Sequence, residues 1–206
     1  MNRRSPLDSV VATTRGDDGT TGLLFGGERI AKDDPRAEAY GTIDEAVAAL
    51  GLARASAAAE RLPATAAGDL GDLILRIQRE LFVVGAELAT NPDAWDRLED
   101  GRTRVSASMV AALEGILVET ERGIVMPREF VVPGETATSA ALELARTVLR
   151  RAERRAVALR RDGFVPGEHL VPYLNRLADL VWVLARAAEQ AASRSATAAR
   201  SEPRGR

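Results

Sequence analysis

Residues Thr136–Arg161 read TATSAALELARTVLRRAERRAVALRR, and the fold follows most directly from this segment. Small and apolar side chains recur along it at steps of three and four: Leu142, Ala145, Leu149, Ala152, Ala156 and Leu159. That spacing places them on one stripe of a helix, with charged side chains on the remaining surface. Gly163 and Pro166 follow, and both residue types end helices. The segment therefore predicts a long helix that packs through an apolar face.

Four other segments carry helical periodicity, at Arg36–Ala58, Ala67–Leu88, Ser106–Thr120 and Glu168–Ala192. Met126–Gly134 is short, apolar and bounded by prolines, so we expect an extended connector there. Aromatic residues make up only 4% of the chain, which favours helices that pack closely through small side chains. We therefore predict an all-α fold, a five-helix up-down bundle.

A chain of 206 residues is long enough for one sizeable core, so we predict a single domain. This domain is expected at residues 13–192, with a glycine-rich loop at 13–34 and the helical bundle at 36–192. Residues 1–12 lack periodicity and are predicted to be a mobile tail. Residues 193–206 are mostly serine, alanine and arginine, and are predicted to be disordered.

The composition excludes several classes of function. The 28 basic and 30 acidic residues give a net charge of −2, which argues against a nucleic-acid-binding protein. The chain has no cysteine and one histidine, His169, so disulfides, thiolate metal sites and two-histidine sites within one chain are excluded. His169 lies beside an expected helix start, and a terminal position explains it better than catalysis. With no membrane-length apolar run and no secretory pattern, we expect a cytoplasmic protein.

The glycine-rich loop is the first candidate site. Its glycines, such as Gly16, Gly19 and Gly22, allow backbone N–H groups to approach an anion, and its threonine hydroxyls add donors. It is not a Walker loop, because Glu28 and Arg29 stand where lysine and serine or threonine are needed. An ordinary surface loop is the alternative, and composition alone slightly favours it. The single lysine among 27 arginines, Lys32, also lies here.

A row of arginines is the second candidate. Arg146–Arg161 holds seven arginines and one acidic residue, and Arg146, Arg150 and Arg154 share one ridge of the helix at steps of four. Like charges at that spacing repel, and a polyanion would relieve the repulsion through bidentate hydrogen bonds. The alternative is a solvated face paired with acidic residues of neighbouring helices.

Polar residues also interrupt apolar helix faces. Asp44 follows Ile43, while Asn175 and Asp179 are flanked by leucines. Half-buried carboxylates need partners, and the arginine row supplies candidates. A structural salt bridge is the alternative for at least one of them.

Three blocks of sequence together resemble the trimeric-type ATP:cob(I)alamin adenosyltransferases. The first runs from TTRGDDGTT at residues 13–21 through GER and KDD to YGTIDE at 40–45. The second contains FVVPG at 130–134 and RRAERR at 150–155, and the third is LNRLADL at 174–180. In order and spacing the resemblance covers residues 13–188. The chain departs from the usual pattern at Ala46, Val47, Glu143 and Leu149, where many relatives carry leucine, asparagine, histidine and cysteine. These departures affect the corrinoid side more than ATP binding.

The resemblance implies a homotrimer that binds ATP and a corrinoid between adjacent subunits. By match to the family motifs, the ATP-binding residues are Thr13, Thr14, Arg15, Gly16, Asp18, Thr20, Thr21, Lys32, Arg150, Glu153, Arg154 and Asn175. Mg²⁺ is implied as a companion of ATP, without a metal ligand assigned to the protein. The implied catalytic residues are Asp44, Phe130, Arg146 and Arg150. Asp44 is expected to pair with Arg146, and Phe130 to lie against the lower face of the corrin.

The implied reaction is transfer of the 5′-deoxyadenosyl group of ATP to the cobalt of reduced cobalamin, with release of tripolyphosphate. It needs no general base. A reductase and an adenosylcobalamin-dependent mutase are possible partners under this resemblance, while nucleic acid and membrane are not expected. A trimer that binds ATP or adenosylcobalamin and delivers the cofactor to a mutase without turnover is an alternative. A purely structural helical oligomer is a further one, but it leaves the glycine-rich loop and Lys32 unexplained.

Overall fold

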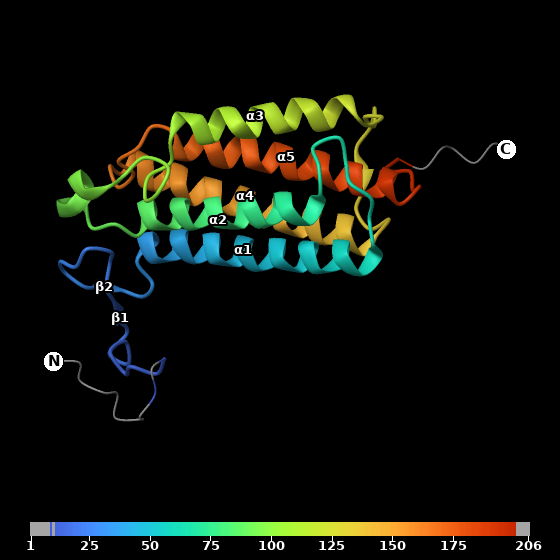
Figure 1. Ribbon diagram of the computed structural model, residues 1–206. Coiled ribbons are helices and arrows are strands. Elements are labelled where there is room, and N and C mark those ends of the chain that lie inside the picture. The colour runs from blue at the N-terminus through green and yellow to red at the C-terminus, as the bar shows by residue number, and fades with distance from the viewer. Residues whose placement is uncertain (1–8, 10, 201–206) are drawn as a thin grey trace.

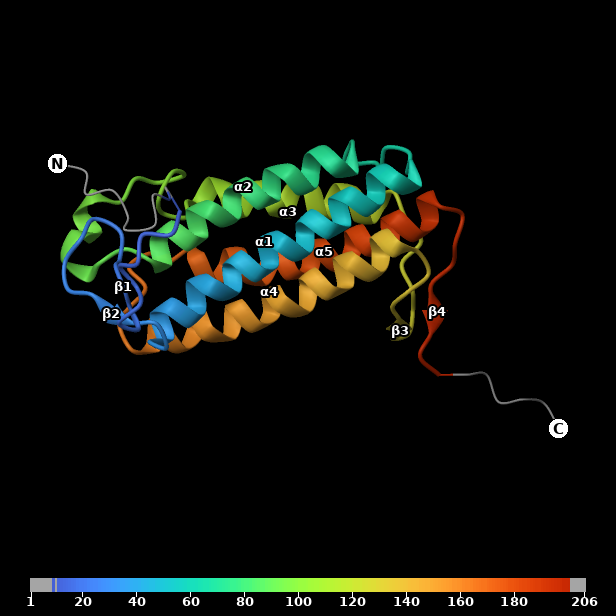
Figure 2. The same cartoon turned by 90° about the horizontal axis from the view of Figure 1, so that it is seen from below.

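The computed structural model describes residue 9 and residues 11–200, and five long helices lie side by side in this part of the chain (Figures 1 and 2). They are α1 (Pro35–Glu60), α2 (Leu70–Leu88), α3 (Ala107–Arg122), α4 (Ala137–Arg161) and α5 (Leu170–Ala191). The predicted all-α bundle is confirmed, and the helix limits agree to within about three residues. None of the described helices is long and apolar enough to cross a membrane.

Small side chains bring the central helices together. The predicted stripe of α4 is buried along its whole length, with every member 3% exposed or less. On α1, which packs against α4, Ala39, Ala46 and Ala53 are fully buried. Alanine allows two helix axes to approach closely, and this accounts for the low aromatic content of the core.

The helix limits follow from local chemistry. α1 begins with Pro35, and the Asp34 carboxylate accepts a hydrogen bond from the Arg36 N–H at 2.8 Å. Thr136 and Ser139 form a reciprocal capping box at the start of α4. Gly163, with φ of 81°, follows the end of α4 in the left-handed conformation that glycine tolerates.

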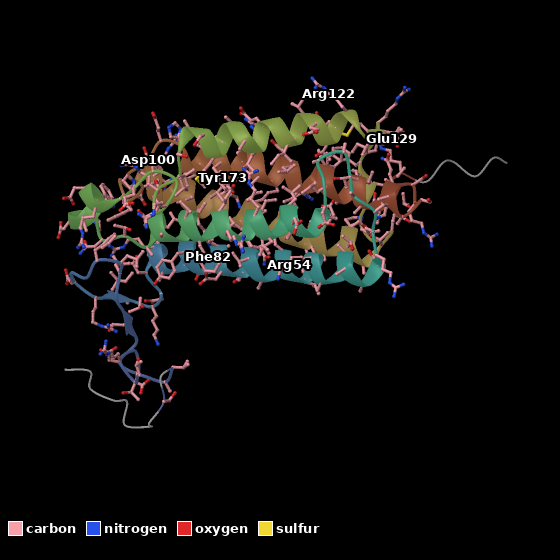
Figure 3. The ribbon with its side chains drawn as sticks, in the orientation of Figure 1. Arg54, Phe82, Asp100, Arg122, Glu129 and Tyr173 are labelled. Atoms are coloured by element: carbon pink, nitrogen blue, oxygen red, sulfur yellow. The ribbon has the colours of Figure 1, made fainter. Side chains whose placement is uncertain are left out.

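Tyr173 of α5 lies between helices (Figure 3), and its hydroxyl donates a hydrogen bond to Glu80 of α2 at 2.8 Å. The side chain is fully buried, and burial raises the pKa of Tyr173 well above its usual value. The phenol therefore stays protonated and ties two helices together.

Glu87, near the end of α2, anchors two loops from inside the bundle. It is 1% exposed and accepts hydrogen bonds from the N–H groups of Val105 at 2.7 Å and Gly167 at 3.0 Å. Burial raises the pKa of Glu87, although these two donors act in the opposite direction. The segments before α3 and α5 are thus held by one carboxyl group.

Gly167→Ala is expected to lower the free energy of unfolding by about 1–3 kcal/mol. A β-carbon at this position would lie 2.3 Å from the Glu87 Oε1, so the carboxyl group has to move and lose its hydrogen bonds. Urea unfolding followed by circular dichroism measures the change. The matched control is Gly115→Ala in α3, where a β-carbon meets nothing within 4 Å. Equal stability of the Gly167→Ala and wild-type chains would contradict this account of Glu87.

The structure describes residues 193–200 of the segment predicted to be disordered, and they include a short strand. Thr197–Ala198 forms strand β4, which pairs antiparallel with β3 (Val131–Val132) in the connector before α4. The connector offers an unpaired edge about 65 residues earlier in the chain, and tail composition gives no sign of such a distant partner. Residues 201–206 lie outside the described residues, as does most of the predicted N-terminal tail at 1–12.

Two small elements were also not predicted. Strands β1 (Thr20–Thr21) and β2 (Ile30–Ala31) form an antiparallel hairpin inside the glycine-rich loop. A short 3₁₀ helix, η1 (Pro92–Arg97), follows α2. The hairpin gives the loop a defined shape and makes it a structured element at one end of the bundle (Figure 1).

Candidate functional site

The glycine-rich loop is organised by its own polar side chains. Thr20 donates two hydrogen bonds to Asp18, from its N–H at 2.9 Å and its hydroxyl at 2.8 Å, and these bonds lower the pKa of Asp18. Arg29, the residue directly before β2, donates to the Thr20 hydroxyl at 2.7 Å and the Arg15 carbonyl at 2.8 Å. Four of the predicted site residues are therefore within or beside one turn: Arg15, Gly16, Asp18 and Thr20.

Lys32, the residue directly after β2, closes this turn. Its N–H donates to the Gly19 carbonyl at 2.9 Å, and a β-carbon on Gly16 would lie 2.9 Å from its Nζ. The ammonium group therefore lies directly on the turn at Gly16, where a larger residue would displace it. A compact cation held against a glycine turn is suited to a phosphate.

The base of the loop is fastened to the bundle. Leu24 and Thr90 form a β-bridge, and the Asn91 side chain donates to the Gly26 carbonyl at 2.9 Å. Arg97 stacks on the Phe25 ring, 4.3 Å from its centroid. Figure 1 shows that the tip with β1 projects beyond the bundle on the side of α1.

The predicted ATP residues of the last two helices come together in a second place. Arg150, Glu153 and Arg154 of α4 and Asn175 of α5 line a cavity of about 330 Å³, which we call the arginine cavity. The Asn175 amide donates to Glu153 at 3.1 Å, and Arg154 donates to the Arg150 carbonyl at 3.1 Å. No residue of the glycine-rich loop lines this cavity in the described chain. One chain therefore carries the two predicted halves of the ATP site apart from each other.

Arg151 and Arg155 lie on a second ridge of α4, and they form salt bridges with acidic residues of a neighbouring helix. Arg151 pairs with Glu45, and Arg155 pairs with Glu38 and donates to the Thr42 hydroxyl. These contacts fasten α4 to α1. The ridge with Arg150 and Arg154 has no such acidic partners on α1 in the described structure and faces its cavity instead.

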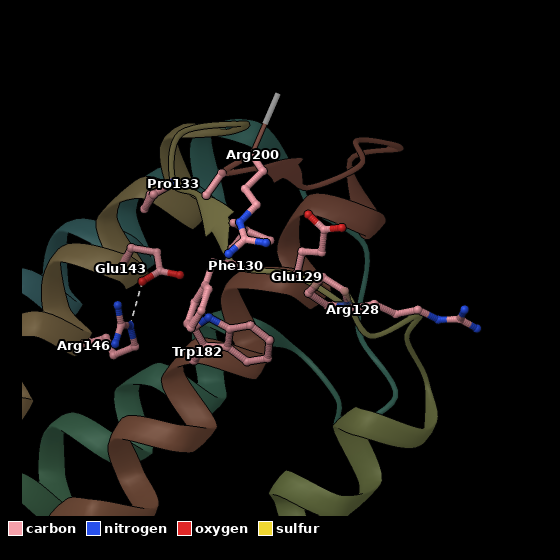
Figure 4. Close-up of a pocket in the computed structure, with 11 residues that line it drawn as sticks. Arg128, Glu129, Phe130, Pro133, Glu143, Arg146, Trp182 and Arg200 are labelled. Atoms are coloured by element: carbon pink, nitrogen blue, oxygen red, sulfur yellow. Dashed lines mark hydrogen bonds and ion pairs between the residues drawn. The ribbon is translucent and has the colours of Figure 1, made fainter. Parts of the chain in front are cut away.

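A larger cavity of about 790 Å³ lies about one turn nearer the N-terminal end of α4 (Figure 4). We call it the aromatic cavity, and it is lined by Pro127, Arg128, Glu129, Phe130, Val131, Pro133, Glu143, Arg146, Trp182, Ala199 and Arg200. Phe130 is 90% exposed, so it is not a core aromatic residue. An apolar ring held in the open, between two prolines, is an unusual surface feature that suits a large apolar ligand.

The predicted pair of Asp44 and Arg146 does not form within the described chain. Arg146 Nε lies 2.7 Å from a carboxylate oxygen of Glu143, three residues earlier on the same helix. Asp44 is exposed on α1 and makes no ion pair with the described residues. Within one chain the acidic partner of Arg146 is Glu143 of its own helix, and the pair of Asp44 and Arg146 stays a prediction.

Glu143 belongs to a buried network that was not predicted. Arg186 of α5 is 1% exposed and lies 3.2 Å from Glu143 and 2.8 Å from Glu189. Its guanidinium also lies 5.5 Å from the centroid of Trp182. The sequence carries one signal of this network, since Arg186 and Glu189 interrupt an otherwise apolar run. Because Glu143 and Trp182 also line the aromatic cavity, this network borders that cavity.

The two cavities share one helix. Arg146 lines the aromatic cavity and Arg150 lines the arginine cavity, one helical turn apart. Side chains at i and i+4 lie about 6 Å apart on a helix surface. The two cavities therefore carry neighbouring arginines of the same helix ridge. The described residues contain no group of three or more His, Asp or Glu that could hold a metal ion.

The fold and site define a helical-bundle protein with an arginine-lined cavity beside a wide aromatic one. Residues 11–188 match the family model described as cobalamin adenosyltransferase, so the chain belongs to that family.

Curated relatives agree with this placement. A corrinoid adenosyltransferase of Citrobacter freundii is 39% identical over 179 residues, covering 87% of this chain and 94% of the relative. One of Mycobacterium tuberculosis is 39% identical over 184 residues, covering 86% and 88%. The chain spans about half the length of the corrinoid adenosyltransferase PduO of Salmonella typhimurium, with 37% identity and coverage of 86% of this chain and 49% of that relative.

Solved structures share the fold. A variant PduO-type ATP:corrinoid adenosyltransferase from Lactobacillus reuteri, complexed with cobalamin and ATP, superposes with a TM-score of 0.76. It is 28% identical, and the match covers 92% of this chain and 98% of that one. A second variant of the same protein, complexed with ATP, has the same TM-score at 27% identity, covering 92% and 100%.

Proposed function

We propose that this chain transfers the 5′-deoxyadenosyl group of ATP to the cobalt of reduced cobalamin. The observation that carries the proposal is the position of the two cavities on one face of α4, with Arg150 in one and the exposed Phe130 in the other. A nucleotide and a corrinoid held there can react directly. Family membership and the ligands named for the Lactobacillus reuteri structure support the same reaction.

The reaction is a nucleophilic substitution at carbon. Cobalt(I) attacks the 5′ carbon of ATP, a cobalt–carbon bond forms, and the carbon–oxygen bond to the triphosphate breaks. Negative charge grows on the leaving tripolyphosphate, so its stabilisation by Arg150, Arg154, Lys32 and a Mg²⁺ ion carried by ATP lowers the barrier. Thr13, Thr14 and Thr21 add donors to the same group, while Thr20, which donates to Asp18, shapes the turn that holds it. No proton has to be removed by the protein.

Phe130 has a separate task under this proposal. Its ring covers the lower face of the corrin and keeps an axial ligand away from cobalt, which makes cobalt(II) easier to reduce. The 90% exposure of the side chain supports this role, because the ring is available to a ligand. The proposal includes three further elements. A reductase supplies the electrons, the product is delivered to a mutase, and the protein is located in the cytoplasm, where ATP is available.

The active unit is proposed to be a homotrimer with sites between subunits. Within one chain the loop residues do not line the arginine cavity, and Asp44 does not reach Arg146. A neighbouring copy can bring both pairs together. Leu52 of α1 and Leu144 of α4 are 54% and 52% exposed, which supports burial in a subunit contact.

The assembly prediction is checked by sedimentation velocity of the wild-type chain. At micromolar concentration we expect one species with the mass of three chains, because each site needs parts of two copies. A stable monomer that retains full activity would contradict the shared site.

The test of function is an anaerobic assay with ATP and chemically reduced cob(I)alamin. The expected result is the spectrum of adenosylcobalamin together with one tripolyphosphate for each cobalamin converted. Binding of ATP and cobalamin without conversion would instead support the alternative of a cofactor-delivering trimer. Failure to bind either ligand would sink the whole proposal.

Lys32→Arg is expected to lower ATP affinity although the charge is kept. Lys32 Nζ fits against Gly16, and the planar guanidinium of arginine needs a different geometry around phosphate. We expect a loss of about tenfold, equivalent to about 1.4 kcal/mol, in isothermal calorimetry. Arg160→Lys, on the exposed end of α4, is the control and should bind ATP normally. Unchanged affinity of the Lys32→Arg chain would show that Lys32 does not contact phosphate.

A further inference from the structure

The connector that carries Phe130 is held through its backbone. The Phe130 ring is 90% exposed, so it contributes little packing to its own position. At the start of the connector, Val125 exchanges two hydrogen bonds with the Gln190 side chain of α5, at 2.9 and 2.8 Å. At its other end, Val131–Val132 pairs with Thr197–Ala198. The place of the ring therefore depends on these backbone contacts.

The contact nearest to the ring comes from the C-terminal segment. The Ala199 N–H donates to the Phe130 carbonyl at 2.7 Å. Two residues earlier, the Thr197 hydroxyl donates to the Glu135 carboxylate, just beyond the connector. Ala199 and Arg200 also line the aromatic cavity together with Phe130. The segment thus holds the backbone of Phe130 and forms part of the cavity wall.

We propose that Thr197–Arg200 is a positioning strand for the reaction, which fixes Phe130 at the height where its ring excludes the lower axial ligand of cobalt. The inference rests on the proposed function and adds a new element to it. The family-model match ends at residue 188, so the strand lies beyond the sequence that defines the family. Small displacements of a group that orients a reactant can cost about a hundredfold in rate. A small displacement of the Phe130 ring is therefore expected to lower the rate that starts from cob(II)alamin.

Two proline substitutions separate the key hydrogen bond from general damage to the strand. Ala199→Pro removes the N–H that donates to Phe130. Ala198→Pro is the matched control. Hydrogen-bonded and non-hydrogen-bonded pairs alternate in an antiparallel ladder, so the N–H of Ala198 points away from the connector. Deletion of residues 195–206 removes the strand altogether.

Three quantities are measured for each full-length variant and for the deletion. The first is the ratio of the adenosylation rate that starts from cob(II)alamin with a reductant to the rate that starts from prereduced cob(I)alamin. The second is ATP affinity. The third is hydrogen–deuterium exchange of the peptide at residues 127–135, which reports on the hold of the strand without any ligand.

For Ala199→Pro and the deletion, we expect the rate ratio to fall roughly ten- to hundredfold, with unchanged ATP affinity and severalfold faster exchange of the peptide. Ala198→Pro should resemble the wild type in all three. An unchanged ratio in Ala199→Pro would overturn the proposal, and so would equal loss of both rates together with ATP binding. If the wild-type chain adenosylates neither form of cobalamin, the proposed function is contradicted instead. The exchange of the peptide at residues 127–135 then still shows whether the strand restrains the connector.

Discussion

Co-expressed Lys32→Ala and Arg150→Ala chains are expected to recover about a quarter of wild-type activity, although each chain alone is nearly inactive. Loss of one group that stabilises developing charge typically costs about 10²–10³ in rate. Lys32 follows β2 of the glycine-rich loop and Arg150 lines the arginine cavity, so under the shared-site proposal the two defects fall on opposite sides of a subunit contact. An interface that receives Lys32 from one chain and Arg150 from the other then contains both groups.

The expected fraction follows from counting. Random assembly of two chains into cyclic trimers gives about three-quarters mixed trimers, and each of these holds about one intact interface in three. The same mixture made by combining separately purified, non-exchanging trimers should stay inactive. The rate is measured by the corrinoid spectrum with prereduced cob(I)alamin and saturating ATP.

The control pair is Arg150→Ala with Arg154→Ala. Both residues line the same cavity of one chain, so no interface of a mixed trimer can receive both intact arginines from one subunit. This mixture should remain as inactive as its parents. Recovery in the control, or none with the Lys32→Ala partner, would mean that the loop and the cavity do not form one site between subunits.

The helices could be predicted because their signals are local. The stripe of α4 repeats every three or four residues, and each member is buried as expected. The capping residues and Gly163 are equally local. The β3–β4 pair could not be predicted, since Val131–Val132 and Thr197–Ala198 find each other only after the bundle brings the connector and the tail together.

More of the arginine cavity than of the aromatic cavity could be predicted from the sequence. The arginine cavity unites Arg150, Glu153, Arg154 and Asn175, because helical spacing fixes the first three and the packing of α5 on α4 adds the fourth. The corrinoid side depends on contacts that no motif records. The pairing of Arg146 with Glu143 is one case, since none of the motifs behind the resemblance includes it.

Trp182, Arg186 and Glu189 were missed for a related reason. They lie within the apolar run of α5, where the stripe of buried residues dominates the pattern. Arg186 has its charges balanced by Glu143 on another helix, and a single-helix pattern cannot identify such a partner. A buried ionic network in a small-residue core is visible only once the helices are packed.

Phe130→Ala is expected to abolish turnover that starts from cob(II)alamin, while much of the activity from prereduced cob(I)alamin remains. The ring acts before reduction, by excluding the lower ligand, and the later attack on ATP does not need it. Truncation of a core phenylalanine would cost about 3–5 kcal/mol of stability. At 90% exposure we expect a change within about 0.5 kcal/mol, so the melting temperature should barely move.

Phe82→Ala is the matched control for this prediction. Phe82 lies on α2 and is 65% exposed, but it does not line the aromatic cavity (Figure 3). Its truncation should leave the ratio of the two activities unchanged. Stopped-flow spectra of bound cob(II)alamin in the presence of ATP add a direct readout, because loss of the lower ligand changes the absorption of the cobalt.

If the Phe130→Ala chain binds ATP normally, keeps its stability and still adenosylates cob(II)alamin at the wild-type rate, the ring is not the group that excludes the ligand. Equal loss of both activities would instead assign Phe130 to corrinoid binding in general, since a ring needed only for reduction cannot slow a reaction that begins after it.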